Sequence, residues 1–220
     1  MITAQIASIP ERIDCLKATV TSIIDQVDLL FVALNGHDDV PEFLTNNRKI
    51  VYIIMDNSLG DAAKFYDADQ RKGYVFTCDD DIAYPQGYVR YMINGIEQYG
   101  GIVTLLGKKY DARPISSYRS GYTYIARSLS HVATPSVVHV GGTGVMAFHT
   151  DDFNIPMEYF KEKNMADLWV AKAAAEQGVT ITALPHPKNY IAHSHYSKRI
   201  WVSERDNDGY QTNVINSFLK

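Results

Sequence analysis

The chain has 220 residues, of which 46% are hydrophobic and 21% are charged, and its formal net charge is −4. This composition indicates a globular protein with room for one large α/β domain, and the absence of a dense Lys/Arg block excludes a nucleic-acid groove. No stretch approaches the roughly 18 to 20 consecutive apolar residues of a membrane span, and the first residues lack a signal peptide's basic start, so we expect a cytoplasmic protein.

The first part of the chain alternates strand and helix patterns. Apolar runs predict strands over residues 2–7, 29–34 and 50–55 and a further strand that ends at Asp79. Helical spacing predicts helices over residues 13–24, 62–70 and 86–99. Such a βαβ series predicts a central, mostly parallel sheet flanked by helices, in a single domain.

Beyond Gly101 the pattern is less regular. We expect a strand over residues 102–106 and an irregular, functional or mobile segment over 108–131. Two strand pieces, 137–140 and 145–148, flank the glycine turn 141–144, which either lets the backbone approach a ligand or makes a plain hairpin. A helix over residues 167–177, a strand over 180–184 and a polar tail complete the chain.

The acidic triplet Asp79, Asp80 and Asp81 directly follows the apolar run of residues 74–76. Three adjacent carboxylates repel one another at the end of a buried strand, so they need positive charge nearby, most simply a divalent metal ion. The alternative is a solvated loop or a helix start, where Asp is also favoured. The strand context favours a metal site at the sheet's carboxyl edge, where open α/β sheets bind ligands.

Four short segments occur in a recognisable order: 8–12 opens the first helix, 34–36 follows the second strand, Asp56 follows the third, and 79–81 follows the fourth. In this order they resemble the nucleotide-sugar glycosyltransferases of the GT-A fold. More narrowly, they resemble the family-2-like enzymes that build bacterial capsules and related surface glycans, and virus-encoded relatives of these enzymes.

The resemblance is clearest over residues 1–105, with looser matches at 141–144, at Asp167 and at 193–195. It implies one GT-A, Rossmann-like domain over residues 1–220, with a nucleotide-binding half, 1–105, and an acceptor-binding half, 106–220. A viral relative would work in the host cytoplasm. It also implies a UDP-sugar donor, a glycan or glycoconjugate acceptor, and Mn²⁺ or Mg²⁺ as cofactor.

Several residues then match nucleotide-sugar contacts of that family. They are Pro10, Arg12, Asn35, Asp56, Asp61, Lys64, Asp79 and Asp80. Asp79 is expected near the ribose or the metal, and Asp56 could accept the imide N–H of uracil, which favours a UDP-sugar. Turn chemistry is the alternative for Asp56, and surface exposure is the alternative for Arg12 and Lys64.

For the metal, the resemblance implies Asp81 and Asp79, together with an imidazole from His195 or His193. The two histidines alternate along an extended segment and so point the same way, and neutral imidazole suits Mn²⁺. Either histidine could instead play no part in metal binding.

Asp167 is the candidate general base for an inverting transfer, and a helix N-cap is its alternative role. Ala166 stands where the family's commoner pattern has Glu.

Two other functions compete with the glycosyltransferase. A sugar nucleotidyltransferase also needs paired carboxylates, but it predicts a glycine-rich loop after the first strand, and residues 8–12 contain no glycine. A non-catalytic module that binds glycans or nucleotides would keep the fold without turnover. The identity of the sugar depends on pocket shape and a few hydrogen bonds, which a sequence pattern does not encode.

Overall fold

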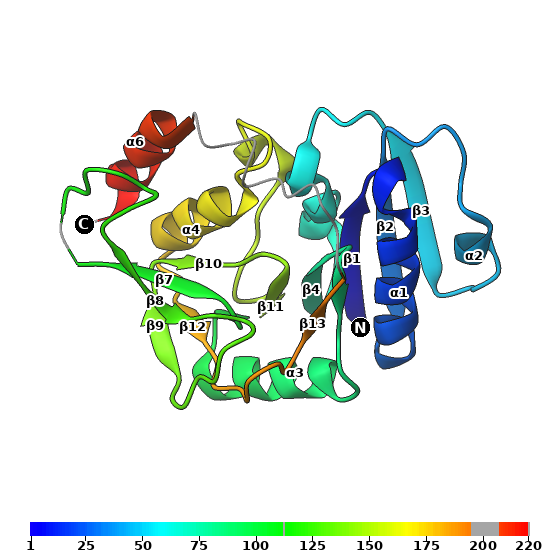
Figure 1. Cartoon of the computed structure of the whole chain (residues 1–220), viewed down its shortest axis with the longest axis horizontal. Helices are drawn as coiled ribbons and strands as arrows, with labels where there is room; N and C mark the ends of the chain where they lie inside the picture. The colour runs from blue at the N-terminus through cyan, green and yellow to red at the C-terminus, as the bar shows by residue number, and fades with distance from the viewer. Residues whose placement is uncertain (112, 195–206, 220) are drawn as a thin grey trace.

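The computed structural model describes residues 1–111, 113–194 and 207–219. In this part of the chain, eight strands form a central sheet in the order β3-β2-β1-β4-β11-β6-β12-β9 (Figure 1). Their bounds are β1 Ile2–Ser8, β2 Leu29–Asn35, β3 Ile50–Met55, β4 Tyr74–Asp79, β6 Ile102–Thr104, β9 Ser136–Val138, β11 Val145–His149 and β12 Ile181–Ala183. The strands from β3 to β4 are parallel, as are β6 and β12. The predicted α/β fold with a mostly parallel sheet is confirmed.

Helices cover both faces of this sheet. The apolar stripes of α1 (Ile13–Ile23) and α3 (Tyr88–Tyr99) pack on one face, together with the alternate strand residues Ile6, Val32 and Phe76. On the other face lies α4 (Ala166–Gln177), against which α6 (Asp208–Phe218) packs. The short helix α2 (Glu42–Thr45) precedes the edge strand β3. No helix in the described part of the chain has the length and apolar character needed to cross a membrane.

Short 3₁₀ segments connect these elements. They are η1 (Pro10–Arg12), η2 (Ile24–Gln26), η3 (Gly60–Phe65), η4 (Ala68–Gln70) and η5 (Met157–Tyr159). The predicted helix over 62–70 is therefore wrong, because η3 and η4 are separate and Asp67 between them has a left-handed φ of 53°. The predicted helix start at Gln86 is also early, since Gly87 adopts φ 86° and α3 begins after it.

The structure corrects three expectations for the second half. Residues 108–131 are not irregular throughout, because β7 (Gly107–Tyr110) and β8 (Tyr122–Ala126) form an antiparallel hairpin. The predicted strand over 137–140 is divided into β9, which pairs with β12, and β10 (Val140–Gly141), which pairs with β7. The polar tail includes α6, which we did not predict.

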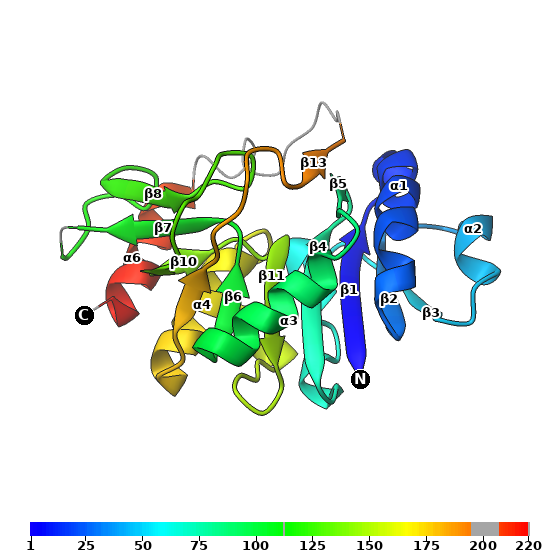
Figure 2. The same cartoon turned by 90° about the horizontal axis from the view of Figure 1, so that it is seen from below.

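Strand β11 lies antiparallel between β4 and β6. Its first residue, Val145, pairs with Cys78, so the glycine turn that precedes it is brought to the carboxyl end of β4. A second small pairing lies near this edge, where β5 (Ile82–Ala83) meets β13 (Ala192–His193). In Figure 2 the β5–β13 pair and the β7–β8 hairpin lie at the same end of the molecule, the end toward which β1 points.

Candidate functional site

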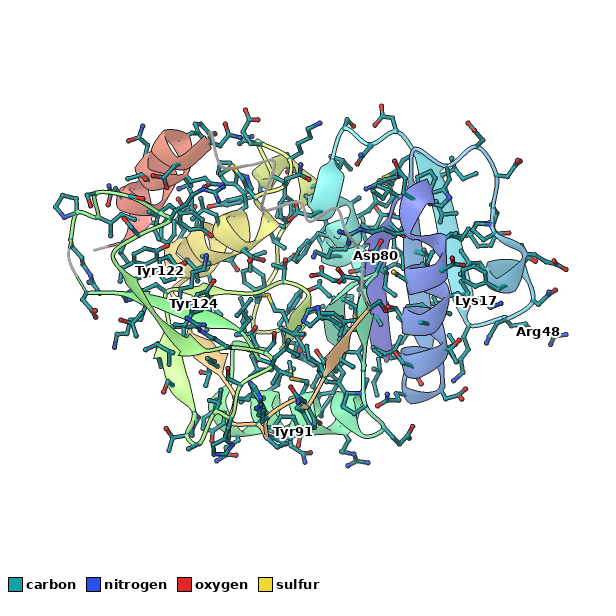
Figure 3. The ribbon with its side chains drawn as sticks, viewed as in Figure 1. Lys17, Arg48, Asp80, Tyr91, Tyr122 and Tyr124 are labelled. Atoms are coloured by element: carbon teal, nitrogen blue, oxygen red, sulfur yellow. The ribbon has the colours of Figure 1, made fainter. Side chains whose placement is uncertain are left out.

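The acidic triplet lies at the carboxyl end of β4, next to β1 in the sheet, and Asp80 is among the residues labelled in Figure 3. Its three side chains differ in exposure. The side chain of Asp80 is 5% exposed, that of Asp81 is 20% exposed and that of Asp79 is 44% exposed. The Thr19 hydroxyl on α1 supports this turn by donating to the backbone oxygens of Asp80 and Ile82, at 3.0 and 2.8 Å. Asp80 is thus turned inward, and its two neighbours are partly exposed.

Asp80 forms a buried ion pair with Arg12. The guanidinium Nη1 lies 2.7 Å from Oδ1 of Asp80 and 3.4 Å from Oδ2 of Asp81, and the Ser8 hydroxyl donates to Oδ2 of Asp80 at 2.6 Å. Burial raises the pKa of Asp80 to about 6, although Arg12 and Ser8 both favour its carboxylate form. The surface-exposure alternative for Arg12 is therefore wrong, because this side chain is buried and braces the triplet from the first βα connection.

Lys64 plays the corresponding role for Asp79. Its Nζ lies 2.6 Å from Oδ1 of Asp79, and the residue is only 3% exposed. Burial acts to lower the pKa of Lys64, but the charges of Asp79 and Asp61 outweigh it and raise this pKa. In the same way, burial acts to raise the pKa of Asp79, and Lys64 outweighs it and lowers this pKa. The solvated-lysine alternative is wrong.

These two cations supply part of the positive charge that the sequence led us to expect beside the acidic triplet. Arg12 and Lys64 balance Asp80 and Asp79 without any metal ion, so charge repulsion alone does not require one. In the described residues no three His, Cys, Asp or Glu side chains are grouped to hold a metal. Asp79 and Asp81 nevertheless offer hard carboxylate oxygens on the open side, and Mg²⁺ is commonly bound through one or two carboxylates plus substrate phosphates. The donor set fits such a substrate-completed site.

One of the two predicted histidines lies beside this pair of carboxylates. His193 on β13 is paired with Ile82, the residue after Asp81, and the Ser194 N–H donates to the Asp81 carbonyl at 2.7 Å. Burial and the charge of Asp79 raise the pKa of Asp81, and the charge of His193 acts in the opposite direction on this pKa and on that of Asp79. His195 lies outside the described residues.

Asp167 does not cap its helix. It lies within the first turn of α4, where Met165 occupies the N-cap position, so the N-cap alternative is wrong. Instead, Oδ1 of Asp167 accepts hydrogen bonds from the backbone N–H and the hydroxyl of Thr143, at 2.8 and 2.7 Å. Thr143 belongs to the glycine turn, so this turn positions the carboxylate predicted as the base.

The glycine turn also contacts the acidic triplet. The Thr77 hydroxyl on β4 donates to the Thr143 carbonyl at 2.6 Å. The Tyr84 hydroxyl donates to the Gly144 carbonyl at 2.5 Å and accepts from the Asp79 N–H at 3.0 Å. The plain-hairpin alternative is wrong, because the strands on either side of the turn, β10 and β11, pair with other partners. Tyr84 is a site residue that sequence reasoning missed, since nothing in its local pattern marks it.

The remaining predicted nucleotide contacts are spread along neighbouring strand ends. Pro10 is the first residue of η1. Asn35, at the end of β2, donates from Nδ2 to the Gly60 carbonyl at 2.8 Å, while its buried Oδ1 has no partner in the described residues. Asp61 accepts from the Ala166 N–H at 3.2 Å, and burial raises its pKa to about 6. Asp61 thereby links η3 to the start of α4.

Asp56 lies apart from the other predicted residues. It follows β3, the edge strand, and its exposed carboxylate accepts hydrogen bonds from the backbone N–H and the hydroxyl of Ser58. This Asx turn is the turn-forming role that the sequence context of Asp56 gave as the alternative to uracil binding. The structure therefore leaves Asp56 at the end of the edge strand β3. It brings together the other predicted side chains Arg12, Asp61, Lys64, Asp79, Asp80, Asp81 and Asp167.

No protein-family model and no curated protein matches the sequence. Among solved structures, S. aureus TarS (residues 1–349) is similar, with a TM-score of 0.57 and 14% identity, over 88% of this chain and 60% of that one. The same protein in complex with UDP-GlcNAc gives a TM-score of 0.60 and 12% identity, over 100% and 72% of the two chains. The chain thus spans less than two thirds of the first of these structures.

A Bacillus anthracis protein assigned as a glucose-1-phosphate thymidylyltransferase, in complex with a sucrose, is also similar. Its TM-score is 0.53 at 14% identity, over 97% of this chain and 99% of that one. At these identities the likenesses show the fold. That fold, predicted from the sequence as GT-A-like, is shared with a UDP-GlcNAc-bound protein and with a thymidylyltransferase.

Proposed function

We propose that the chain is a metal-dependent glycosyltransferase that moves a sugar from a UDP-sugar to a glycan or glycoconjugate acceptor. The observation that carries this proposal is the placement of Asp79 and Asp81 on the open side of the carboxyl end of β4. Ligands of open α/β sheets bind at such strand ends. The shared fold with UDP-GlcNAc-bound TarS supports the same assignment.

Asp79 and Asp81 are the residues that would hold Mn²⁺ or Mg²⁺. When bound, such an ion neutralises negative charge that develops on a diphosphate leaving group. The chain's own contribution is a rigid frame around these carboxylates: Lys64 fixes Oδ1 of Asp79, and Arg12 lies 3.4 Å from Oδ2 of Asp81. Because Asp80 is held inward by Arg12 and Ser8, we assign it a supporting role.

Asp167 is the proposed general base. Thr143 fixes its Oδ1 through two hydrogen bonds, which orients the carboxylate and leaves Oδ2 for an acceptor hydroxyl. As the acceptor oxygen bonds to the anomeric carbon, the bond from that carbon to the diphosphate oxygen breaks, and the hydroxyl proton passes to Asp167. A base opposite the leaving group gives inversion, so we expect the product to have the inverted anomeric configuration.

The test follows UDP release from UDP-sugars with Mn²⁺, in the presence and absence of glycan acceptors. Asp81→Asn should reduce the rate by about 100-fold or more if the carboxylate holds the ion, since a Lewis acid contributes several kcal/mol. It should also weaken the Mn²⁺-dependent binding of UDP measured by calorimetry. The exposed Asp25→Asn is the matched control. A fully active, Mn²⁺-binding Asp81→Asn protein would remove Asp81 from the metal site.

The thymidylyltransferase fold match favours a second candidate, a sugar nucleotidyltransferase. Against it stands the connection after β1, which has no glycine and whose Arg12 is buried against Asp80. The products separate the candidates, because a nucleotidyltransferase releases pyrophosphate from a nucleoside triphosphate and a sugar 1-phosphate. A non-catalytic binding module would release neither UDP nor pyrophosphate.

A further inference from the structure

An open pocket lies on the β7–β8 hairpin, away from the acidic triplet. It has a volume of about 490 Å³ and is lined by Arg119, Ser120, Tyr122, Thr123, Tyr124 and Arg127. We call it the hairpin pocket. In Figure 3, Tyr122 and Tyr124 lie over the half of the molecule opposite to the half that holds Asp80. None of the roles assigned above uses these residues.

Lys108 lies behind the lining of this pocket, against two of its tyrosine rings. From β7, its Nζ lies 4.6 Å from the ring centre of Tyr118, 4.9 Å from that of Tyr122 and 5.8 Å from that of Tyr124. Ring faces attract a cation but do not neutralise its charge. In the described structure no carboxylate forms an ion pair with Lys108. The ammonium group therefore keeps the capacity to bind an anion.

Arg127 adds a second cation. Its guanidinium carbon lies 4.5 Å from the ring centre of Tyr124. A stacked guanidinium still presents its N–H edge, which matches the geometry of a carboxylate or a phosphate. The aromatic rings beside it offer the broad apolar faces that the pocket needs to hold the uncharged part of a ligand.

The charge of this region is opposite to that of the whole chain. Residues 107–131 contain five Lys or Arg residues and one acidic residue, whereas the complete chain has a net charge of −4. The positive residues are Lys108, Lys109, Arg113, Arg119 and Arg127, and the acidic one is Asp111. Among the described residues, Asp208 accepts from the Arg119 N–H at 3.0 Å, and the charge of Asp167 acts on Tyr124. Such local excess positive charge attracts an anionic ligand.

Asp167 connects this pocket to the proposed reaction site. Burial is the main influence on the pKa values of Lys108 and Tyr124, and the charge of Asp167 acts on both. The same carboxylate also acts on Lys64 beside Asp79. Asp167 therefore lies within electrostatic range of both the hairpin pocket and the acidic triplet.

We propose that the hairpin pocket binds an anionic glycan, and that the acceptor of the transfer carries a carboxylate or phosphate group one or more units from the reacting hydroxyl. Lys108 and Arg127 bind the anionic group, and the tyrosine rings pack against the sugar. That this glycan is the acceptor of the transfer rests on the proposed function, whereas the binding of an anionic glycan can be tested without any turnover.

The test is calorimetric titration of the whole chain with three oligosaccharides of equal length: a neutral one, one with uronic acid residues and one with phosphate groups. We expect one or both anionic ligands to bind, and the neutral one to bind at least about tenfold more weakly, as expected for the loss of a charged hydrogen bond. The anionic oligosaccharide that binds identifies the anionic group that the pocket recognises. Equal affinity for all three ligands, or binding of none, overturns the proposal.

Lys108→Met should weaken the anionic ligand by about tenfold or more. Lys109→Met is the matched control, because Lys109 is the exposed neighbour on the same strand and its side chain points to the other face. If Lys108→Met fails to fold, the salt dependence of wild-type binding decides, since the affinity must fall as ionic strength rises. A separate titration with UDP-sugar and Mn²⁺ tests the proposed function, so the two failures are distinguishable.

Discussion

Gly144 lies so close to Asp79 that there is no room for a side chain between them. A Cβ atom on Gly144 would lie 2.1 Å from Oδ2 of Asp79. The carboxylate has little freedom to withdraw, because its Oδ1 is bound by the buried Lys64. Position 144 therefore requires glycine, because no larger residue fits next to Asp79.

Replacing this glycine with alanine should displace the Asp79 carboxylate and break its bond to Lys64. We expect Gly144→Ala to lower the free energy of unfolding by about 1–3 kcal/mol, the usual cost of overpacking, and to weaken Mn²⁺-dependent UDP binding. Denaturant titration measures the first effect. Gly209→Ala is the control, since nothing lies within 4 Å of a Cβ there, and alanine is favoured in a helix. A Gly144→Ala protein as stable as wild type would contradict the geometry.

The buried pair of Arg12 and Asp80 gives a second prediction. Arg12→Met leaves the Asp80 carboxylate in the interior with, among the described residues, only the Ser8 hydroxyl as a polar side-chain partner, so we expect a loss of about 3 kcal/mol or more in unfolding free energy. Asp80→Asn in the same background should restore part of this loss, because no charge then needs compensation. The measurement is a double-mutant cycle by denaturant unfolding. Strictly additive losses would show that the pair does not act as a unit.

Asp61 should make stability depend on pH. Burial raises its pKa to about 6 in the folded protein, whereas an unfolded Asp ionises near pH 3.9. Between these values the folded state binds more protons than the unfolded state, so this group's contribution to stability falls as pH rises and levels off above about pH 6. Asp61→Asn removes that dependence. We expect the variant to match wild type near pH 4 and to exceed it by about 2 kcal/mol near pH 7.

Thermal or denaturant unfolding at a series of pH values, without added metal ions, measures this difference. The exposed Asp25→Asn serves as the control and should follow the wild-type curve. If the gap between Asp61→Asn and wild type stays constant from pH 4 to 7, the raised pKa is refuted.

Thr143 should act as a positioning residue for Asp167. Thr143→Val removes the hydroxyl donor to Oδ1 but keeps the backbone N–H, so we expect kcat to fall by about tenfold with a small change in KM for the donor. Thr143→Ser should restore the rate, because serine keeps the hydroxyl donor.

The control for this variant is Thr3→Val. Thr3 is fully buried on β1 and its hydroxyl has no partner in the described residues, so valine there should cost little. A Thr143→Val enzyme with unchanged kcat would remove Thr143 from the positioning role.

Local patterns were enough to predict the first four strands and the first helix. The strands β1 to β4 and the helix α1 lie within about one residue of their predicted bounds, because each has an uninterrupted apolar run or stripe. The β7–β8 hairpin was missed because its strands are rich in Lys, Tyr and Thr, and their stability comes from packing with distant segments. In the connection between the two strands, for example, the backbone N–H of Tyr118 donates a hydrogen bond to the Thr212 hydroxyl at 2.9 Å.

The candidate site, too, could be predicted only in part. The acidic triplet and its place at a strand end followed from the sequence, but its partners did not. Arg12 reaches Asp80 over a separation of 68 residues, and no spacing rule predicts which of two nearby cations meets which carboxylate. The same holds for Asp167, because the local sequence left a helix cap as an alternative role and gave no sign of the hydrogen bonds from Thr143.

The antiparallel strand β11 also bears on how the chain can be divided. The sheet edge of β4 is completed by residues 145–149, and these lie well beyond the nucleotide-binding half predicted over 1–105. A fragment that ends near residue 105 would leave the backbone groups along one side of β4 unpaired, and such open edges recruit other chains. We therefore expect that fragment to self-associate when expressed by itself, whereas co-expression with the remainder should rescue it by fragment complementation.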